Sequence, residues 1–548
     1  MPNQFKIPFI PTEEATPLVN SLVVLIESLL AENQLLKETV QQMRDEIAVL
    51  KGEKAKPKFK ASRLDKDAGN KPSDSGDDDE NKKRPGSSKR AKTAQLTIHH
   101  TEIIKCVEPL PEGSRFKGYR DWVVQDIKIE AHNTKYRLEC WQTPTGEMLV
   151  GVLPEALEKQ HFGPELRTYI IYQHHHCQVT QPLLWEQLQE WGVDISVGQI
   201  DALLTSKQDS FVVEKDSLLS TALEVTDSIT VDDSGARHQG KNGYVTHMGN
   251  AYFAWFASTN SKSRINFLNL LHAGPVGYII SEDAVNYMQE QGLAQKPLLR
   301  LQSHPLYGLE AIKGIPDTGS WEQHMDSLGI TGKRHRQIAT EGALIGSLLE
   351  KGFRHDLAIV SDGAGQFAIF LHALCWVHTE RLVHKLIPLN ETHRQDIARV
   401  RGQIWDFYAD LKAYQIQPEP NRIAEFENRF DEIFTQKTSF ETLNSALKRS
   451  WGHKDELLLV LRRPGIPLHT NGSETDIRDY VKKRKISGGT RSDLGKQCRD
   501  TFASLKKTCR KLGISFWAYL TDRLLLKNEI PPLASIIRQR ALVTEPPP

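Results

Sequence analysis

The chain has 548 residues and the composition of an ordinary globular protein, with 39% hydrophobic and 25% charged residues. At about 150 residues per domain, this length predicts roughly three to four folding units and excludes a disulfide-stapled miniprotein. The 70 Lys and Arg residues balance 69 Asp and Glu residues to a formal net charge of +1. The total charge therefore indicates no class of partner, and only local clusters of charge can do so.

The cysteines and the apolar segments lead us to expect a cytoplasmic protein. Six cysteines are scattered along the chain without a CxxC pair, which is typical of reduced thiols. The most apolar stretch, residues 21–30, is interrupted by Glu27 and two serines, and a membrane span needs roughly 20 apolar residues. This stretch also lacks the basic start and the cleavage site of a signal peptide. We therefore expect no membrane association.

After a flexible segment, residues 1–18, the apolar residues follow a seven-residue period across residues 19–52. β-Branched residues recur at one core position of the heptad and Leu at the other, with one central Asn, which favours a parallel two-stranded coiled coil. The period predicts a leucine zipper that forms a homodimer, and an amphipathic helix packed on its own chain is the alternative. The predicted dimerisation residues are Leu22, Ile26, Leu29, Asn33, Leu36, Val40, Met43, Ile47 and Leu50.

The next two segments differ in their content of large apolar residues. Residues 53–95 contain almost none and carry many charges, so we expect a disordered linker that cannot bury enough surface to fold. Across residues 96–158, short β-rich runs alternate with turn residues. They predict a small β-rich domain, to which the sequence assigns no chemistry.

Residues 159–215 are predicted to form a helix-turn-helix DNA-binding domain. Gly192 supplies a tight turn, and Ser196 with Gln199 three residues later has the spacing of a capping box. The helix at about 197–206 could enter a major groove. Its surface is not strongly basic, so a purely structural three-helix unit is the alternative. The HHHC run at 174–177 is not expected to bind metal, because consecutive helix residues point in different directions.

The largest predicted unit, residues 222–525, begins with three strand-like runs and a helical run, the opening pattern of an RNase H-like fold. The first run ends in an acidic turn that contains Asp232, and a later buried strand ends at Asp362. A helix that starts near residue 471 carries Glu474 in its first turn. Converging carboxylates of this kind suit Mg²⁺, which prefers oxygen ligands and can promote displacement at phosphorus in pairs.

Each of these acids also has a simpler explanation. Asp and Gly favour turns without any catalysis, which accounts for the surroundings of Asp232 and Asp362. Glu474 follows Asn471 by three residues, so it could complete a capping box or interact favourably with a helix N-terminus. The order of the three acids and the residues around them are what favour a catalytic site.

Three segments of the chain resemble the catalytic core of insertion-sequence-66 family transposases. They read VDDSGARHQGKNGYVTHMG, then SDGAGQF followed by CWVHTERLVHKL, and finally HTNGSETDIRDYVKKRKISGGTRSD. The family also carries an N-terminal leucine zipper and a helix-turn-helix. The resemblance implies that Asp232, Asp362 and Glu474 form the DDE triad that binds the catalytic metal, and that Asp233 supports it.

Two departures from the family pattern affect these expectations. The family typically has a cysteine-rich zinc-binding segment, but only Cys106 and Cys140 stand in that region, so no zinc is expected. Residues 283–352 look like an insertion into the catalytic domain. The run at 276–288 also reads as a strand ending in an acid, which leaves Asp283 as an alternative to Asp362.

Two further sets of residues are candidates for the same site. Cys375, His378 and Arg381 have the spacing of one helical side, and they either brace the site or simply pack. The segment 478–511 is strongly basic and could bind DNA phosphates, with a solvated basic face as the alternative. Its predicted DNA-binding residues are Arg478, Lys482, Lys483, Arg484, Lys485 and Arg491.

Together these features predict a multidomain α+β and α/β protein: a coiled coil, a small β-rich domain, a helix-turn-helix, an RNase H-like domain with an insertion, a helical C-terminus and a tail at 526–548. The predicted function is a DNA-associated transposase that uses Mg²⁺, for which Mn²⁺ can substitute, in strand cleavage and transfer. Its predicted partners are double-stranded DNA, at the element ends and the target, a second copy of itself and small accessory proteins. The alternatives are an inactive DNA-binding regulator and a nuclease without strand transfer.

Overall fold

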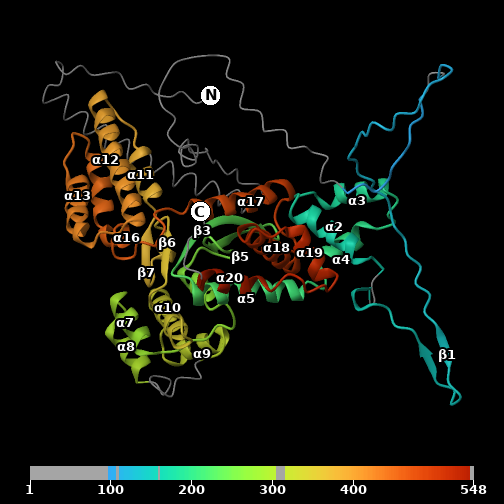
Figure 1. Cartoon of the computed structure of the whole chain (residues 1–548). Helices are drawn as coiled ribbons and strands as arrows, with labels where there is room; N and C mark the ends of the chain where they lie inside the picture. Colours follow the sequence, from blue (N-terminus) through green and yellow to red (C-terminus); the bar gives the residue numbers. More distant parts are fainter. Residues whose placement is uncertain (1–96, 107–109, 158–160, 304–314, 543–548) are drawn as a thin grey trace. The chain divides into compact units, whose positions relative to one another are not determined.

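The computed structural model describes residues 97–106, 110–157, 161–303 and 315–542 (Figure 1). The predicted zipper and charged linker lie outside these ranges. The chain divides into two compact units, of which the smaller covers residues 55–134. The described residues of that unit form no helix or strand, and Trp122 is 85% exposed. In the described ranges, no helix is long and apolar enough to cross a membrane.

The predicted β-rich segment contains one small hairpin in its described residues. Strand β1 (Cys140–Gln142) pairs antiparallel with β2 (Met148–Val150), and the short helix η3 (Glu155–Leu157) follows. The run at 122–131, predicted as a strand, is not one in the structure. The strand residues of the hairpin are all exposed, and an isolated two-stranded ribbon with no covered face is only marginally stable.

A five-stranded sheet is the centre of the larger unit, with the strand order β5-β4-β3-β6-β7. Within this sheet, β4 pairs antiparallel with both β3 and β5. Strand β6 pairs parallel with β3, and β7 pairs parallel with β6. Their bounds are β3 (Ser228–His238), β4 (Lys241–Gly249), β5 (Ala254–Thr259), β6 (Ala358–Ser361) and β7 (Leu371–Leu374). Three of the predicted strand runs are found here, at 244–249, 251–258 and 357–360.

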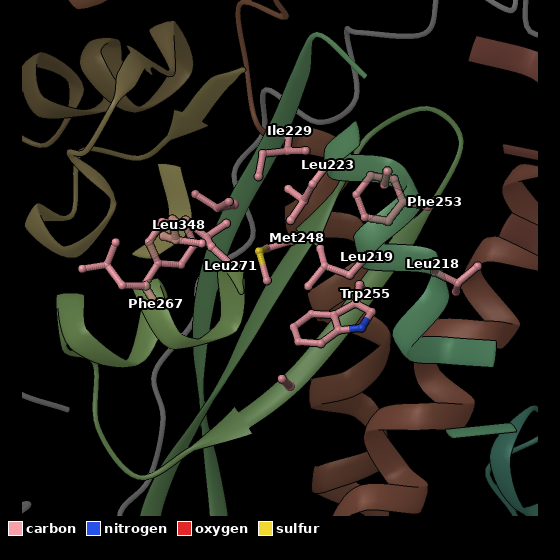
Figure 2. Packing of buried hydrophobic residues seen from close by; sticks show 14 of the residues in the cluster. Leu218, Leu219, Leu223, Ile229, Met248, Phe253, Trp255, Phe267, Leu271 and Leu348 are labelled. Carbon is pink, nitrogen blue, oxygen red and sulfur yellow. The ribbon is translucent and has the colours of Figure 1, made fainter. Parts of the chain in front are cut away.

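The side chains of β3 alternate between two different environments, as the pleat of a strand requires. Ile229 and Val231 belong to the main hydrophobic core. That core includes Leu218, Leu219 and Leu223 of helix α5 (Asp209–Val225), which Figure 2 shows beside the strand residues. The intervening residue Thr230 faces the other way, where its hydroxyl lies 2.6 Å from that of Ser473. Even-numbered residues of β3 therefore face the helix that carries Glu474.

Three short helices precede α5, as the helix-turn-helix prediction requires. They are α2 (Pro164–His175), α3 (Gln181–Glu190) and α4 (Val197–Thr205). Gly192 has a φ of +74°, which suits a residue without a Cβ. Ser196 and Gln199 form the predicted capping box at the start of α4. The described helices fit the predicted outline, and DNA binding by α4 stays a prediction.

The segment between β5 and β6 is helical and contains the predicted insertion. Its helices are α6 (Arg264–Leu271), α7 (Glu282–Glu290), α8 (Gln295–Gln302), α9 (Thr318–Ser327) and α10 (Lys333–Glu350). Helix α10 is buried along most of its length and packs on α6 and α7. Close packing with α7 explains Gly342, where a Cβ would lie 2.7 Å from Met288.

A second helical body with its own core lies between β7 and the Glu474 helix. It contains α11 (Trp376–His384), α12 (Glu391–Ile416), η6 (Pro420–Arg422), α13 (Ile423–Thr435), α14 (Glu441–Trp451), α15 (Lys454–Leu457) and α16 (Leu459–Arg462). The N–H of Trp376 donates to the carbonyl of Leu468 at 2.9 Å, and the N–H of Thr470 contacts the sulfur of Cys375 at 3.4 Å. The chain therefore enters and leaves this body at one point. This body was not predicted from the sequence as a separate unit.

Four helices complete the described chain: α17 (Asn471–Ser487), α18 (Asp493–Lys511), α19 (Phe516–Leu524) and α20 (Leu533–Leu542). Ser504 and Thr508 of α18 accept hydrogen bonds from the backbone of β5, at 2.9 and 3.2 Å, and so cover that edge strand. Helix α20 packs on α5 and buries Leu533 and Ile537. Residues 533–542, which were predicted as part of a tail, therefore belong to the folded unit.

Candidate active site

Asp232 lies inside β3 rather than in the turn that the sequence predicted. Residues 232–235 pair in register with residues 244–247 of β4, and the chain turns only at Gln239 and Gly240, which have φ values of +50° and +75°. The composition of this run is typical of a turn, but pairing with β4 keeps it extended. The carboxylate accepts a hydrogen bond from the N–H of Asp233 at 2.8 Å.

Asp362 follows β6 directly, at the same level of the sheet as Asp232. The last parallel pair of the two strands is Thr230 with Val360, and each acid lies two residues beyond it. The side chains of both acids are therefore on the same face of the sheet. Gly363 has a φ of +95°, and the N–H of Ala364 donates to the Asp362 carboxylate at 3.0 Å. The predicted turn after this strand is confirmed.

Glu474 reaches the same region from the first turn of α17. The helix begins at Asn471, and no side chain caps its N-terminus, so the capping-box explanation for Glu474 does not apply. The hydroxyls of Ser473 and Thr230, 2.6 Å apart and both buried, hold this turn against β3. Glu474 is therefore placed beside the strand position that Asp232 occupies.

Asp362 and Glu474 both act electrostatically on Asp232. Burial and the neighbouring Asp362 carboxylate, with a further contribution from Glu474, raise the pKa of Asp232 to about 7. Mutual repulsion of this kind is relieved when a cation binds. Among the described residues, however, no group of three His, Cys, Asp or Glu side chains is placed closely enough to hold a metal ion.

Two side chains of one helix hold the carboxylate of Glu474. The guanidinium of Arg381 donates to both of its oxygens, at 3.0 and 3.4 Å, and His378 Nε2 lies 3.5 Å away. Both partners come from α11. Burial lowers the pKa of His378, but contacts with Cys375 and Glu474 together raise it. Arg381 and His378 therefore contact the last acid directly, whereas Cys375 contacts the N–H of Thr470.

Asp233 supports the strand on its opposite face. Its carboxylate accepts hydrogen bonds from the hydroxyl of Thr246 at 2.5 Å and from the side-chain amide of Gln366 at 2.9 Å. Burial raises its pKa despite these two bonds. Because Gln366 follows Asp362 by four residues, this contact joins the turn after β6 to β3. Asp233 was predicted from the sequence, whereas Thr246 and Gln366 were not.

Asp283, the alternative second acid, lies elsewhere. It is exposed in the first turn of α7, where Ser281 caps the helix. The run before it forms no strand of the five-stranded sheet, and Tyr278 makes only an isolated bridge with Ile315. The structure therefore brings Asp362, and not Asp283, to Asp232.

The predicted DNA-binding residues of α17 divide into exposed and enclosed groups. Arg478, Lys482 and Lys485 are exposed and follow Glu474 along one side of the helix, and Arg491 is exposed after its end. Lys483 is buried, and its ammonium group donates to the carbonyl of His174 at 2.6 Å. Arg484 is half-buried and lies against β3, where a Cβ on Gly235 would be 3.3 Å from its guanidinium. We therefore remove Lys483 and Arg484 from the predicted DNA-binding set.

The buried Lys483 predicts a pH-dependent stability. Burial, with Arg499 and Lys506 nearby, lowers its pKa to about 7. A lysine in the unfolded chain has a pKa of about 10.4. Between these values the unfolded chain holds a proton that the folded chain lacks, so the free energy of unfolding rises with pH. Lys483→Met should remove this rise, and urea unfolding between about pH 7 and pH 10 would measure it.

The matched control for this prediction is Lys482→Met, one position away and exposed. It should leave the pH dependence of wild type unchanged. If Lys483→Met shifts the free energy of unfolding by the same amount at every pH, the ammonium group is not the source of the dependence.

Comparison with known proteins places this site in a family. A family model described as "Transposase IS66 family" matches residues 342–498, a range that contains Asp362, α11 and Glu474. "Uncharacterized protein y4jO" of Sinorhizobium fredii (strain NBRC 101917 / NGR234) is 40% identical over 327 residues, which are 59% of this chain and 100% of that protein. The chain belongs to the IS66 transposase family. The resemblance read from the sequence is thereby confirmed. The matched range of this IS66 family member contains Asp362 and Glu474, two of the three acids described above.

Proposed function

We propose that this protein is a DNA transposase of the DDE type, with Asp232, Asp362 and Glu474 as its catalytic acids. The observation that carries the proposal is that three acids, each separated from the next by over a hundred positions, come from β3, β6 and α17 near enough for Asp362 and Glu474 both to raise the pKa of Asp232. The strand order, with three antiparallel strands followed by two parallel ones, supports an RNase H-like catalytic core. Membership of a transposase family supports the reaction class.

The donor set fits Mg²⁺ or Mn²⁺, because its groups are carboxylate oxygens. Asp232, Asp362 and Glu474 would hold the metal, with Glu474 turning from Arg381 toward the other two acids. When bound, divalent ions activate the attacking oxygen and stabilise the leaving oxygen at phosphorus. A nearby cation would favour the ionised form of Asp232, whose pKa is raised to about 7.

The surrounding residues position these acids and the DNA. The guanidinium of Arg381 balances the negative charge of the Glu474 carboxylate until a metal ion binds. The exposed cations Arg478, Lys482 and Lys485 continue from Glu474 along α17, where they would attract the DNA backbone without reading its sequence. Water would be the nucleophile for cleavage, and a DNA 3′-hydroxyl the nucleophile for transfer. The zipper would bring two copies of the chain together.

The direct test incubates the purified full chain with DNA that carries the inverted repeats flanking its coding region. The expected result is nicked and joined product in Mg²⁺ or Mn²⁺, resolved on denaturing gels. Nicks without joined product would support the nuclease alternative. Binding to the repeats without any strand cleavage under either metal would support the inactive regulator.

The basic side of α17 gives a quantitative prediction. Replacing Arg478, Lys482 or Lys485 by Gln should weaken binding to all DNA sequences alike, and each replacement should reduce the slope of log affinity against log salt by about one. Fluorescence anisotropy at several salt concentrations would measure this slope. Lys296→Gln, an exposed lysine on α8, is the control and should keep the wild-type slope. An unchanged slope in all three α17 variants would place the DNA on another surface.

A further inference from the structure

Behind the turn that carries Asp362, three side chains form a continuous hydrogen-bonded chain. Ser361 is the last residue of β6, His372 lies on β7, and Glu456 lies on α15. The Ser361 hydroxyl is 2.8 Å from His372 Nε2, and His372 Nδ1 is 2.7 Å from the Glu456 carboxylate. None of these contacts belongs to the group of acids described above.

The hydrogen-bonding capacities of the three groups order the chain. An ionised carboxylate only accepts hydrogen bonds, so the Nδ1–H of His372 donates to Glu456. In the tautomer that carries its proton on Nδ1 alone, Nε2 accepts the hydrogen bond that the Ser361 hydroxyl donates. The same hydroxyl oxygen accepts the N–H of Gly363 at 3.1 Å. All polar groups along the chain are thus satisfied, and the chain ends on the backbone of the Asp362 turn.

Serine, histidine and a carboxylate in this order also occur in nucleophilic hydrolases, but Ser361 cannot act in that way here. Its residue is fully buried, with 0% exposure. It also does not line the neighbouring cavity of about 500 Å³, which His372 and Glu456 do line. A substrate in that cavity would meet the outer end of the chain, not the hydroxyl. The arrangement is therefore suited to holding a position.

We propose that Ser361, His372 and Glu456 form a positioning relay that fixes the Asp362 carboxylate for metal binding. The relay holds the residues on both sides of Asp362, since Ser361 precedes it and Gly363 is bonded to the Ser361 hydroxyl. Gly363 has a φ of +95°, a conformation that few other residues would maintain. Support behind a metal ligand typically changes metal affinity by about 10- to 100-fold.

This inference rests on the proposed function, because it assigns a role relative to the proposed metal ligands. The test measures Mn²⁺ binding to the full-length protein directly, from the electron paramagnetic resonance signal of free Mn²⁺. It also measures the Mg²⁺ concentration that gives half-maximal cleavage of end-containing DNA. His372→Ala should weaken Mn²⁺ binding about 10-fold and raise the required Mg²⁺ by a similar factor, and DNA affinity should stay at the wild-type value.

Two more variants keep the test independent of folding defects. Glu456→Gln retains the shape and one acceptor oxygen, so it should fold and give a smaller shift in the same direction. His453→Ala is the matched control, because His453 contacts the other oxygen of Glu456 and is half-exposed, at 51%. It should leave Mn²⁺ affinity at the wild-type value.

The possible outcomes distinguish failure of the relay from failure of the proposed function. Wild-type Mn²⁺ affinity and Mg²⁺ requirement in both His372→Ala and Glu456→Gln would overturn the relay and leave the proposed function intact. A wild-type protein that binds no Mn²⁺, alone or with DNA, would overturn both. Loss of stability in His372→Ala, without any metal effect in the folded Glu456→Gln, would reduce the three residues to packing and also overturn the relay.

Discussion

Asp362→Asn is expected to abolish DNA cleavage and strand transfer while leaving DNA binding at the wild-type level. The substitution preserves size, and the amide oxygen can still accept the N–H of Ala364, so the turn should survive. It removes the negative charge that a divalent cation requires from this ligand. We expect the rate of cleavage in Mg²⁺ to fall by at least about a thousandfold, which corresponds to roughly 4 kcal/mol.

Asp283→Asn is the matched control, because Asp283 is the other acid that the sequence offered for the same role and is exposed on α7. It should cleave DNA at the wild-type rate. Single-turnover assays on end-containing DNA would compare the two variants. An inactive Asp283→Asn beside an active Asp362→Asn would reverse the assignment. Asp232→Asn and Glu474→Gln should behave like Asp362→Asn.

Asp500→Ala is expected to destabilise the protein by about 3 to 5 kcal/mol. Asp500 is a buried residue of α18 whose carboxylate accepts three hydrogen bonds. Two come from the N–H and hydroxyl of Ser258, at 2.7 and 2.9 Å, and one from the hydroxyl of Tyr480, at 2.6 Å. The group thus joins β5 to α17 and α18. Its removal would leave the N–H of Ser258 without this acceptor, and the hydroxyls of Ser258 and Tyr480, 3.2 Å apart, with only each other.

Urea unfolding monitored by circular dichroism would measure this loss. Tyr480→Phe removes only one of the three bonds and should cost about 1 kcal/mol. Asp493→Ala removes an exposed carboxylate from the start of the same helix and should unfold at the wild-type midpoint. An Asp500→Ala protein as stable as wild type would mean that water or another acceptor satisfies these donors.

Several strands were predictable because they depend on local patterns. The strand-like run at 244–249 and the apolar run at 357–360 each predicted a strand close to its observed place. The acidic run at 232–235 was predicted wrongly as a turn. Its residues are typical of turns, but its partner strand β4 determines its conformation, and such pairing is not visible in the run itself.

Contacts between distant residues account for most of what the sequence did not reveal. Lys483 reads as one of several equivalent cations, yet α2, more than three hundred positions earlier, encloses it. Glu456 has no feature that links it to His372, 84 positions away. His372 stands inside the apolar run of β7, shortly before residues 375–378. This histidine was the one signal in the sequence that could have drawn attention to that strand. The zipper stays a prediction, since it lies outside the described residues.

The chain enters and leaves the helical body at one point, and this determines which changes of length the protein can accept. The backbone bond between Trp376 and Leu468 brings the two ends of the body together, so the separation of Asp362 from Glu474 in space does not depend on how many residues lie between them. Loops between the helices of the body can lengthen at little entropic cost. The body therefore tolerates changes in its loops but not its removal, because α11 supplies Arg381 to Glu474 and α15 supplies Glu456 to His372.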